Sequence, residues 1–329
     1  MPQIPSESFI VRSPTLDDAK AIAGLLNACS IEQGRKPLDT EQSIRATMEM
    51  PGLNLETDTL LAIDQRGRVV GCALVQDNPP NALLSALAEV HPQHRGKGIG
   101  TVLCHWIEER ARQAIPRLSA GTRVAVLQKR SSDDKASQDL LLSQGYRVVR
   151  HNFRMVIEMV RPPSQPTKPE GIVIRPFIRD EEGRALVQAI CEAFRDNWGY
   201  VERPFELEYQ RWMHILDSDD DGETARYWFV AVDGNEIVGF ALSRLGMSQD
   251  PEEAWIYVVG VRPAWRRRGI ALALLRQSFW GLYQQGQRRV SLEVDTQNLT
   301  GATRLYEKAG MRVESRYDFL EKELRSGKN

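Results

Sequence analysis

A short segment rich in arginine and glycine occurs twice in this chain, and its residue types are suited to binding an anion. The first copy runs from Val90 to Gly100 (VHPQHRGKGIG), and the second runs from Val261 to Ala271 (VRPAWRRRGIA). Each copy follows an apolar run, passes a proline and enters an amphipathic helical pattern. The first amides of a helix lack intrahelical acceptors and carry the positive end of the helix dipole. A phosphate or diphosphate is therefore the expected ligand of both segments.

Spacing excludes two common nucleotide-binding patterns. The first copy reads Gly96-x-Gly98-x-Gly100, which differs from the G-x-G-x-x-G of dinucleotide-binding folds. Neither copy is followed by the Gly-Lys-Ser/Thr of a triphosphate-binding loop. Glycine and alanine let a ligand approach the backbone amides closely. Formal positive charge around the two turns comes from Arg95, Lys97, Arg266, Arg267 and Arg268.

These residues resemble motif A of the GNAT acyltransferase family, Arg/Gln-x-x-Gly-x-Gly/Ala after a strand ending in Val-x-Pro. The matching positions are Arg95, Gly98 and Gly100 in the first copy and Arg266, Gly269 and Ala271 in the second. A second motif of the family matches the segment from Asn298 to Met311. The resemblance implies acetyl-CoA as acyl donor, bound by Val259, Val261, Arg266, Arg267, Arg268, Gly269, Ile270, Ala271 and Asn298. The corresponding residues of the first copy are Val90, Arg95, Gly96, Lys97, Gly98, Ile99 and Gly100.

Tyr306 distinguishes the two halves of the chain. Aligning Gly145 with Gly310 sets Leu141 opposite Tyr306. In the family, a tyrosine at this position hydrogen-bonds the thioester sulfur and can protonate the departing thiolate, which leucine cannot do. The resemblance thus implies a catalytic second half and a degenerate first half that binds acyl-CoA, shapes the cleft or only stabilises its partner. The alternative for Tyr306 is an aromatic that packs in the core of an amphipathic helix.

Several glutamates are candidates for the general base. An attacking ammonium must lose a proton, and a carboxylate is the usual acceptor. Glu252 and Glu253 precede the fourth strand of the second half, and Glu293 lies on the fifth; a solvated strand edge is the alternative for each. The tandem layout resembles that of mycothiol synthases. The glutamate that those enzymes carry five residues before the strand glycine is Trp255 here.

The acceptor amine is expected to bind between the first two helices of the second half. Asp196, Trp198 and Tyr200 combine a carboxylate with aromatic rings in a glycine-containing segment, a composition that can hold an amine against an aromatic wall. The alternative is a helix C-terminus with packed rings. In the GNAT family, which these motifs resemble, loops at this position line the acceptor site.

The order of elements repeats on both sides of a proline-rich linker. Four prolines fall within residues 161–171, which disfavours helix and interior strand. We therefore expect an N-terminal domain at 1–160 and a C-terminal domain at 172–329. Each half shows an opening strand, two helices, a hairpin, a fourth strand leading into the glycine-containing turn, a helix, a fifth strand, a further helix and a closing strand pair. This order predicts an α+β fold of two tandem GNAT domains, each a mixed, mainly antiparallel sheet flanked by helices.

Composition excludes several classes of function. The net charge of −1 and the pI near 6.6 do not suit bulk nucleic-acid binding. Four scattered cysteines fit a reducing cytoplasm better than a disulfide framework, and no metal site is expected. Asp217 to Gly222 resembles the start of a calcium loop, but Trp228 stands where the closing glutamate belongs. No apolar run is long enough to span a membrane. We expect a cytoplasmic monomer or homodimer.

Two functions remain from the sequence. The first is an N-acetyltransferase that moves an acetyl group from acetyl-CoA to a primary amine of a small molecule by direct attack in a ternary complex. Tyr306 would be its acid, and Glu253 or Glu293 its base. The second is a non-catalytic protein that binds or senses acyl-CoA through both glycine-containing turns. Tyr306 separates the two hypotheses, because only the first requires its hydroxyl group.

Overall fold

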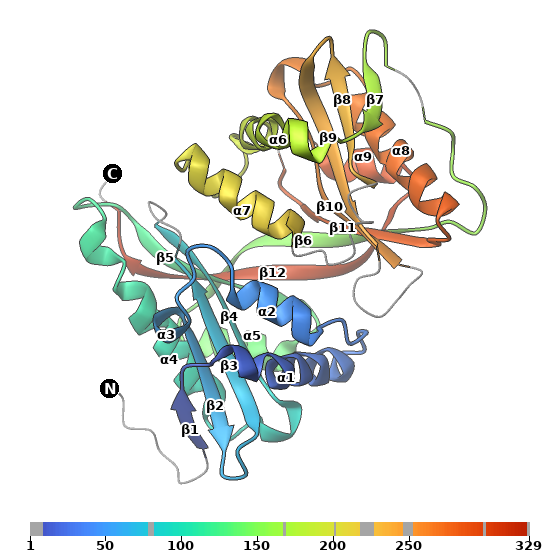
Figure 1. The fold of residues 1–329 in the computed structure, drawn as a ribbon. Coiled ribbons are helices and arrows are strands. Elements are labelled where there is room, and N and C mark those ends of the chain that lie inside the picture. The colour runs from blue at the N-terminus through green and yellow to red at the C-terminus, as the bar shows by residue number, and fades with distance from the viewer. Residues whose placement is uncertain are drawn as a thin grey trace. The chain divides into compact units, whose positions relative to one another are not determined.

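The computed structural model describes residues 9–77, 82–166, 169–200, 202–217, 227–245, 253–298 and 301–327. The chain forms two compact units (Figure 1). Unit 1 consists of Met1–Arg150 and Tyr317–Asn329, and unit 2 consists of His151–Arg316. These bounds differ from a simple division at the linker. The described residues of the linker carry no helix or strand.

Unit 1 is an α+β domain with one mixed sheet in the order β1-β2-β3-β4-β5-β12. Its neighbouring strands pair antiparallel, except that β4 and β5 are parallel. Its strands are β1 (Phe9–Arg12), β2 (Thr59–Asp64), β3 (Val69–Gln76), β4 (Leu83–Val90), β5 (Val124–Ser131) and part of β12 (Arg312–Arg325). Its α-helices are α1 (Ala19–Glu32), α2 (Glu41–Met48), α3 (Leu55–Asp58), α4 (Ile99–Arg112) and α5 (Lys135–Ser143).

Unit 2 repeats this plan with the sheet order β6-β11-β10-β9-β8-β7, in which β10 and β11 are the parallel pair. Its strands are β6 (Arg147–Glu158), β7 (Val173–Pro176), β8 (Phe229–Asp233), β9 (Glu236–Arg244), β10 (Glu253–Val261) and β11 (Arg289–Asp295). Its α-helices are α6 (Arg179–Phe194), α7 (Phe205–Asp217), α8 (Ile270–Gln284) and α9 (Ala302–Lys308). The predicted α+β fold with mixed, mainly antiparallel sheets is confirmed.

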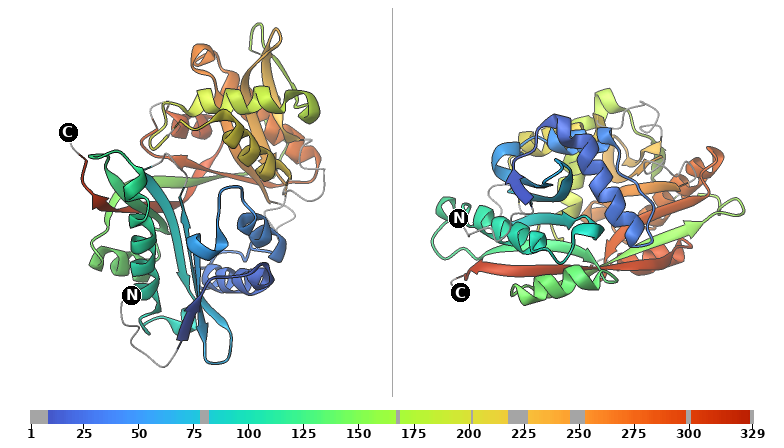
Figure 2. Two further views of the ribbon diagram at one scale, coloured as in Figure 1. Left: turned by 60° about the vertical axis from the view of Figure 1, so that its left-hand side comes forward. Right: turned by 90° about the horizontal axis from the view of Figure 1, so that it is seen from below.

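The two sequence repeats exchange their last strands. Asn152 to Glu158 of β6, from the first repeat, pair with β11 in unit 2. Tyr317 to Arg325 of β12, from the second repeat, pair with β5 in unit 1. Figure 2 shows both as long extended ribbons, β6 in green and β12 in red. The exchange explains why the compact units do not coincide with the repeats along the sequence.

Apolar stripes on the helices after the glycine-containing turns form the cores. In α8, Ile270, Leu274 and Phe279 are buried on one broad face, as the amphipathic sequence pattern predicts. In α4, Leu103 and Ile107 are buried in the same way, and this helix packs on β3 and β4. Each stripe anchors its helix on the sheet and so fixes where the first turn of that helix points.

Candidate active site

A cavity of about 520 Å³ opens in unit 2 where two parallel strands separate. β10 pairs with β11 from Glu253 to Trp255 only, and the strands then diverge. The register of β10 against β9 shifts between Ile256 and Val258, so Tyr257 forms a bulge at the point of separation. The cavity is lined from both strands, from α8 and from α9.

The backbone of the second glycine-containing turn forms an anion nest beside this cavity. Arg267 and Gly269 both have left-handed backbone conformations, with φ of +65° and +79°, and α8 begins at Ile270. Left-handed residues in such a turn direct successive amides to one side. Arg267 is the one non-glycine residue with positive φ among those described. Arg267, Gly269, Ile270, Ala271 and Leu272 line the cavity.

Arg266 and Asp196 form an ion pair with one another. Arg266 also donates to the backbone carbonyls of Ala193 at 2.8 Å and Val261 at 3.2 Å. The hydrogen bonds from Arg266 lower the pKa of Asp196. Both residues line the cavity, but their charges are largely satisfied within the protein. The pair ties the end of α6 to the nest.

Tyr306 lies on α9 and reaches the wall of the cavity. Its side chain packs in a core with Leu292 and Val294, and only 7 % of its surface is exposed. Burial raises the pKa of the phenol. A buried phenol stays protonated at neutral pH and can donate a hydrogen bond into the cavity.

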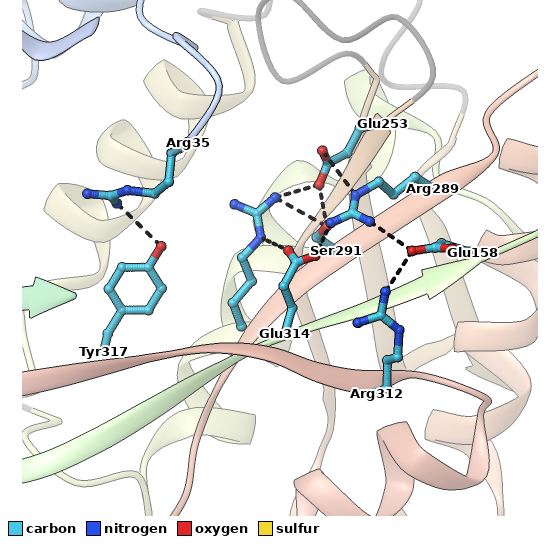
Figure 3. Close-up of polar contacts among 9 residues, drawn as sticks. Arg35, Glu158, Glu253, Arg289, Ser291, Arg312, Glu314 and Tyr317 are labelled. Carbon is cyan, nitrogen blue, oxygen red and sulfur yellow. Dashed lines mark hydrogen bonds and ion pairs between the residues drawn. The ribbon is translucent and has the colours of Figure 1, made fainter. Parts of the chain in front are cut away.

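The candidate carboxylates lie in different surroundings. Glu293 lines the cavity, and so does Asp295 two residues further along β11. Glu253 is buried, accepts hydrogen bonds from the Ser291 hydroxyl and from Arg154 at 2.5 Å, and pairs with Arg289 at 3.4 Å. Figure 3 shows Glu253 with Ser291 and Arg289. Glu253 is not among the cavity-lining residues, and Glu252 falls outside the described residues.

Residues 23–146 and 187–311 each match the model of the acetyltransferase (GNAT) family. The two matches cover most of the chain. This chain belongs to the GNAT family. It is similar to the mycothiol acetyltransferase of Streptomyces scabiei, with 29 % identity over 250 residues, 74 % of this chain and 72 % of the relative. It is also 26 % identical to that of Nocardiopsis dassonvillei, over 89 % of both chains.

Two solved structures resemble the whole of this GNAT protein. The GCN5-related N-acetyltransferase from Sphaerobacter thermophilus has a TM-score of 0.77 and 35 % identity, covering 98 % of this chain and 97 % of that one. A tandem GNAT protein from the clavulanic acid biosynthesis pathway has a TM-score of 0.72. At 14 % identity over 97 % of this chain and 100 % of its own, the second supports the fold alone. The protein is thus a tandem GNAT acetyltransferase.

Most of the site residues predicted for the second half of the chain lie together at the cavity. Val259, Val261 and Asn298 line it along with the nest, Asp196, Glu293 and Tyr306. Arg268 instead donates to the Glu170 carbonyl at 3.3 Å and pairs with Asp233 at 3.6 Å. Trp198 is 43 % exposed, and neither it nor Tyr200 is among the lining residues.

Sequence reasoning assigned no role to Tyr257 and Asp295, although both line the cavity. Tyr257 owes its position to the bulge, which no local pattern predicts. Asp295 lies two residues after Glu293 on β11, so strand periodicity could have identified it. Asn197 follows Asp196 in the segment already assigned to the acceptor.

The glycine-containing turn of unit 1 has the same left-handed backbone conformation as that of unit 2, but its side-chain surroundings differ. Gly96 and Gly98 have φ of +75° and +82°, and α4 begins at Ile99, which is buried. Arg95 pairs with Glu32 at 2.9 Å, and Lys97 is exposed. A Cβ atom on Gly100 would lie 2.8 Å from the Leu140 side chain. Val90 packs at the edge of the core, and Leu141, opposite Tyr306 in the alignment, is buried within it.

The described residues contain no cluster of histidine, cysteine or acidic side chains that could hold a metal ion. Within the same part of the chain, no helix is long and apolar enough to cross a membrane. The acidic loop that resembles a calcium site lies outside the described residues from position 218 onward.

Proposed function

We propose that unit 2 transfers an acetyl group from acetyl-CoA to a primary amine of a small molecule. The observation that carries this proposal is the cavity itself, because a backbone anion nest, a buried phenol and a carboxylate line one space of about 520 Å³. This volume lies in the range of small-molecule sites. The GNAT family supplies the reaction class, and the residues of this cavity supply its parts.

The residues present fit acetyl-CoA. The amides at Arg267 to Ala271 would hold the diphosphate, because they point to one side and the α8 dipole favours an anion there. Space beside Gly269 is open, since a Cβ atom added to it would meet nothing within 4 Å. Past the bulge, Val259 and Val261 line the cavity and would hold the pantetheine arm together with Asn298. When bound, acetyl-CoA supplies an acetyl group activated as a thioester.

Two side chains would move the protons. Glu293 would accept the proton of the attacking ammonium, directly or through water, so that the nitrogen lone pair can attack the acetyl carbon. Tyr306 would donate its phenolic proton to the sulfur as the carbon–sulfur bond breaks and the amide forms. Glu253 is a poorer base, because its carboxylate is buried and occupied by Arg154, Ser291 and Arg289.

Direct attack fits the state of the cysteines. None lines the cavity among the described residues. Burial raises the pKa of Cys29 to about 12 and also raises the pKa of Cys72, Cys104 and Cys191. A thiol held protonated is a poor nucleophile. We therefore propose a ternary complex without an acyl-enzyme.

The acceptor is proposed to enter beside Asp196 and Asn197, with Trp198 and Tyr200 following in the same segment. The similar proteins of Streptomyces scabiei and Nocardiopsis dassonvillei are named mycothiol acetyltransferases. In this chain, Trp255 stands where the resembling enzymes have a catalytic glutamate, and the Arg154 guanidinium lies 5.5 Å from its ring centroid. We therefore assign the acceptor only as a small primary amine.

The decisive experiment replaces Tyr306 with phenylalanine, which keeps the ring in the core and removes the hydroxyl. Turnover of acetyl-CoA with a panel of amines is measured through the free thiol that it releases. The kcat of Tyr306→Phe should be lower than that of the wild type by roughly 10²-fold or more. The affinity for CoA should be unchanged. Equal rates in the two proteins would refute the role of Tyr306. Tight CoA binding with no turnover on any amine would favour the sensing function instead.

A further inference from the structure

A single side chain bridges the gap between β4 and β5 in unit 1. The parallel pairing of these strands runs from Leu83–Ala125 to Ala86–Gln128. Beyond it lies Arg130, whose side chain is 4 % exposed. Nη2 of Arg130 donates to the Ala88 carbonyl of β4 at 2.5 Å and to Oε1 of Gln128 at 3.0 Å. The guanidinium therefore spans the two diverging strands.

The position in unit 2 that corresponds to the Arg130 bridge is the open cavity between β10 and β11. Val124 and Val126 of β5 pack in the core with α4, so Gln128 and Arg130, at intervals of two, face the same side. In unit 2, Leu292 and Val294 of β11 face the equivalent core and line the cavity. Val90 and Val261 begin the two copies of the glycine-containing segment. Ala88 and Val259 each lie two residues earlier and are therefore equivalent positions. The bridge from Arg130 to Ala88 thus crosses the space that is open between Val294 and Val259.

The bridge is held on several sides. Nη1 of Arg130 also donates to Glu89 at 3.2 Å and to the Lys129 carbonyl at 3.1 Å. Gln128 beneath it is fully buried. Moving the guanidinium away would leave buried polar groups without partners, which costs considerably more than losing an exposed contact. These hydrogen bonds hold the guanidinium in the closed arrangement, while Nε of Arg130 and Nε2 of Gln128 are buried without a hydrogen-bond partner among the described residues.

The backbone of β4 also lacks the feature that widens the gap in unit 2. Its register against β3 is unbroken from Ser85–Gln76 to Val90–Gly71. In β10, the bulge at Tyr257 interrupts the corresponding register. Unit 1 thus retains the anion nest at Gly96 and Gly98, but β4 lacks the bulge that accompanies the opening in unit 2.

We propose that Arg130 closes unit 1 to acyl-CoA, so that each chain binds a single acyl-CoA, in unit 2. The assignment of the occupied site rests on the proposed function, whereas the closure of unit 1 does not. Arg130 then determines how many ligands a chain with two nearly identical anion nests can hold.

Calorimetric titration of the full chain with CoA tests the number of sites. We expect one site per chain in the wild type. Arg130→Ala removes the bridge, and a second, weaker site should appear in a protein whose circular dichroism is unchanged. Two sites in the wild type would overturn the proposal. A folded Arg130→Ala protein with one site would also overturn it, because Arg130 would not be what closes unit 1.

Two matched glycine variants decide which unit is occupied and need no change at Arg130. Gly98→Val and Gly269→Val introduce similar backbone strain, since φ is +82° and +79° and both positions have open surroundings. Gly269→Val should weaken CoA binding to unit 2 by about tenfold or more. No binding to unit 1 should replace it, because Arg130 is intact in this variant. Gly98→Val should not change the affinity in the wild-type background, and it should remove the second site of Arg130→Ala.

The outcomes separate this proposal from the proposed function. Residual stoichiometric binding in a folded Gly269→Val protein, abolished by adding Gly98→Val, would place CoA in unit 1 and refute the closure. A wild-type chain that binds no CoA would refute the proposed function of unit 2 and would agree with a closed unit 1.

Discussion

Glu293 and Glu253 illustrate how the surroundings of a residue decide its chemistry. They have the same side chain and lie on adjacent strands of one sheet. Glu293 borders the cavity, whereas Glu253 accepts hydrogen bonds from Ser291 and Arg154 and is only 3 % exposed. The carboxylate of Glu253 is therefore held by structural partners, whereas that of Glu293 borders the space proposed for the substrate.

Replacing each glutamate with glutamine should separate catalysis from stability. Glu293→Gln should lower kcat by roughly 10²-fold with little change in thermal unfolding. Glu253→Gln should lower the free energy of unfolding by about 2–3 kcal/mol, because it leaves buried cationic partners less well compensated. Steady-state rates and chemical denaturation of both variants provide the measurement. The reverse pattern would transfer the role of base to Glu253.

The buried phenol of Tyr306 predicts a feature of the pH profile. Burial raises its pKa above the ordinary value of 10.0, so the protonated form that donates to sulfur persists at alkaline pH. We expect kcat at saturating substrates to stay level between about pH 8 and about pH 9.5. A decline in this window that disappears in Tyr306→Phe would show that the phenol ionises earlier than its burial implies.

At the scale of elements, β6 is the least expected contributor to the catalytic unit. It belongs to the first sequence repeat, yet its residues 152–158 pair with β11. Met155 within β6 and Met159 just after its end are buried in the core that also holds Tyr306. The first repeat is therefore needed for the second to complete its sheet, whether or not unit 1 binds a ligand.

Two fragments should differ sharply in stability for this reason. Residues 172–329 match the second repeat but lack β6, so β11 would present an unpaired edge and the core would lose large apolar side chains, each contributing about 1.5–3 kcal/mol. Residues 151–316 match unit 2 and retain that strand. We expect only the fragment 151–316, whose sheet includes the β6 residues that pair with β11, to unfold cooperatively when circular dichroism is measured against temperature. A sharp transition in 172–329 would contradict the importance of β6.

At the scale of the whole molecule, the exchange couples the two units. Unfolding unit 1 would release β12, which continues from unit 2, and unfolding unit 2 would release β6. Calorimetric unfolding should therefore show one transition rather than two. Saturating CoA should shift that single transition upward without splitting it, since a ligand that binds the native state stabilises it by mass action. Two separate transitions, with CoA moving only one, would show that the units unfold independently.

The sequence by itself determined the repeated elements, because apolar periodicity shows which face of a helix or strand is buried. Most helices and strands of both halves follow the order expected from that pattern, and both glycine-containing turns begin helices as predicted. The structure differs in two places: α3 is additional, and one long strand, β6 or β12, closes each repeat where a strand pair was predicted. Gly96, Gly98 and Gly269 in these turns have left-handed backbone conformations. These features are local, so neighbouring residues were enough to specify them.

The tertiary structure alone decided which groups meet across the fold. Periodicity records that a strand is buried but not which strand it pairs with, so the exchange of β6 and β12 was not predicted. The bulge at Tyr257, the pairing of Arg266 with Asp196 and the bridge made by Arg130 join residues that are far apart in the chain or depend on strand register. Long-range contacts of this kind determine which copy of a repeated motif has room for a ligand.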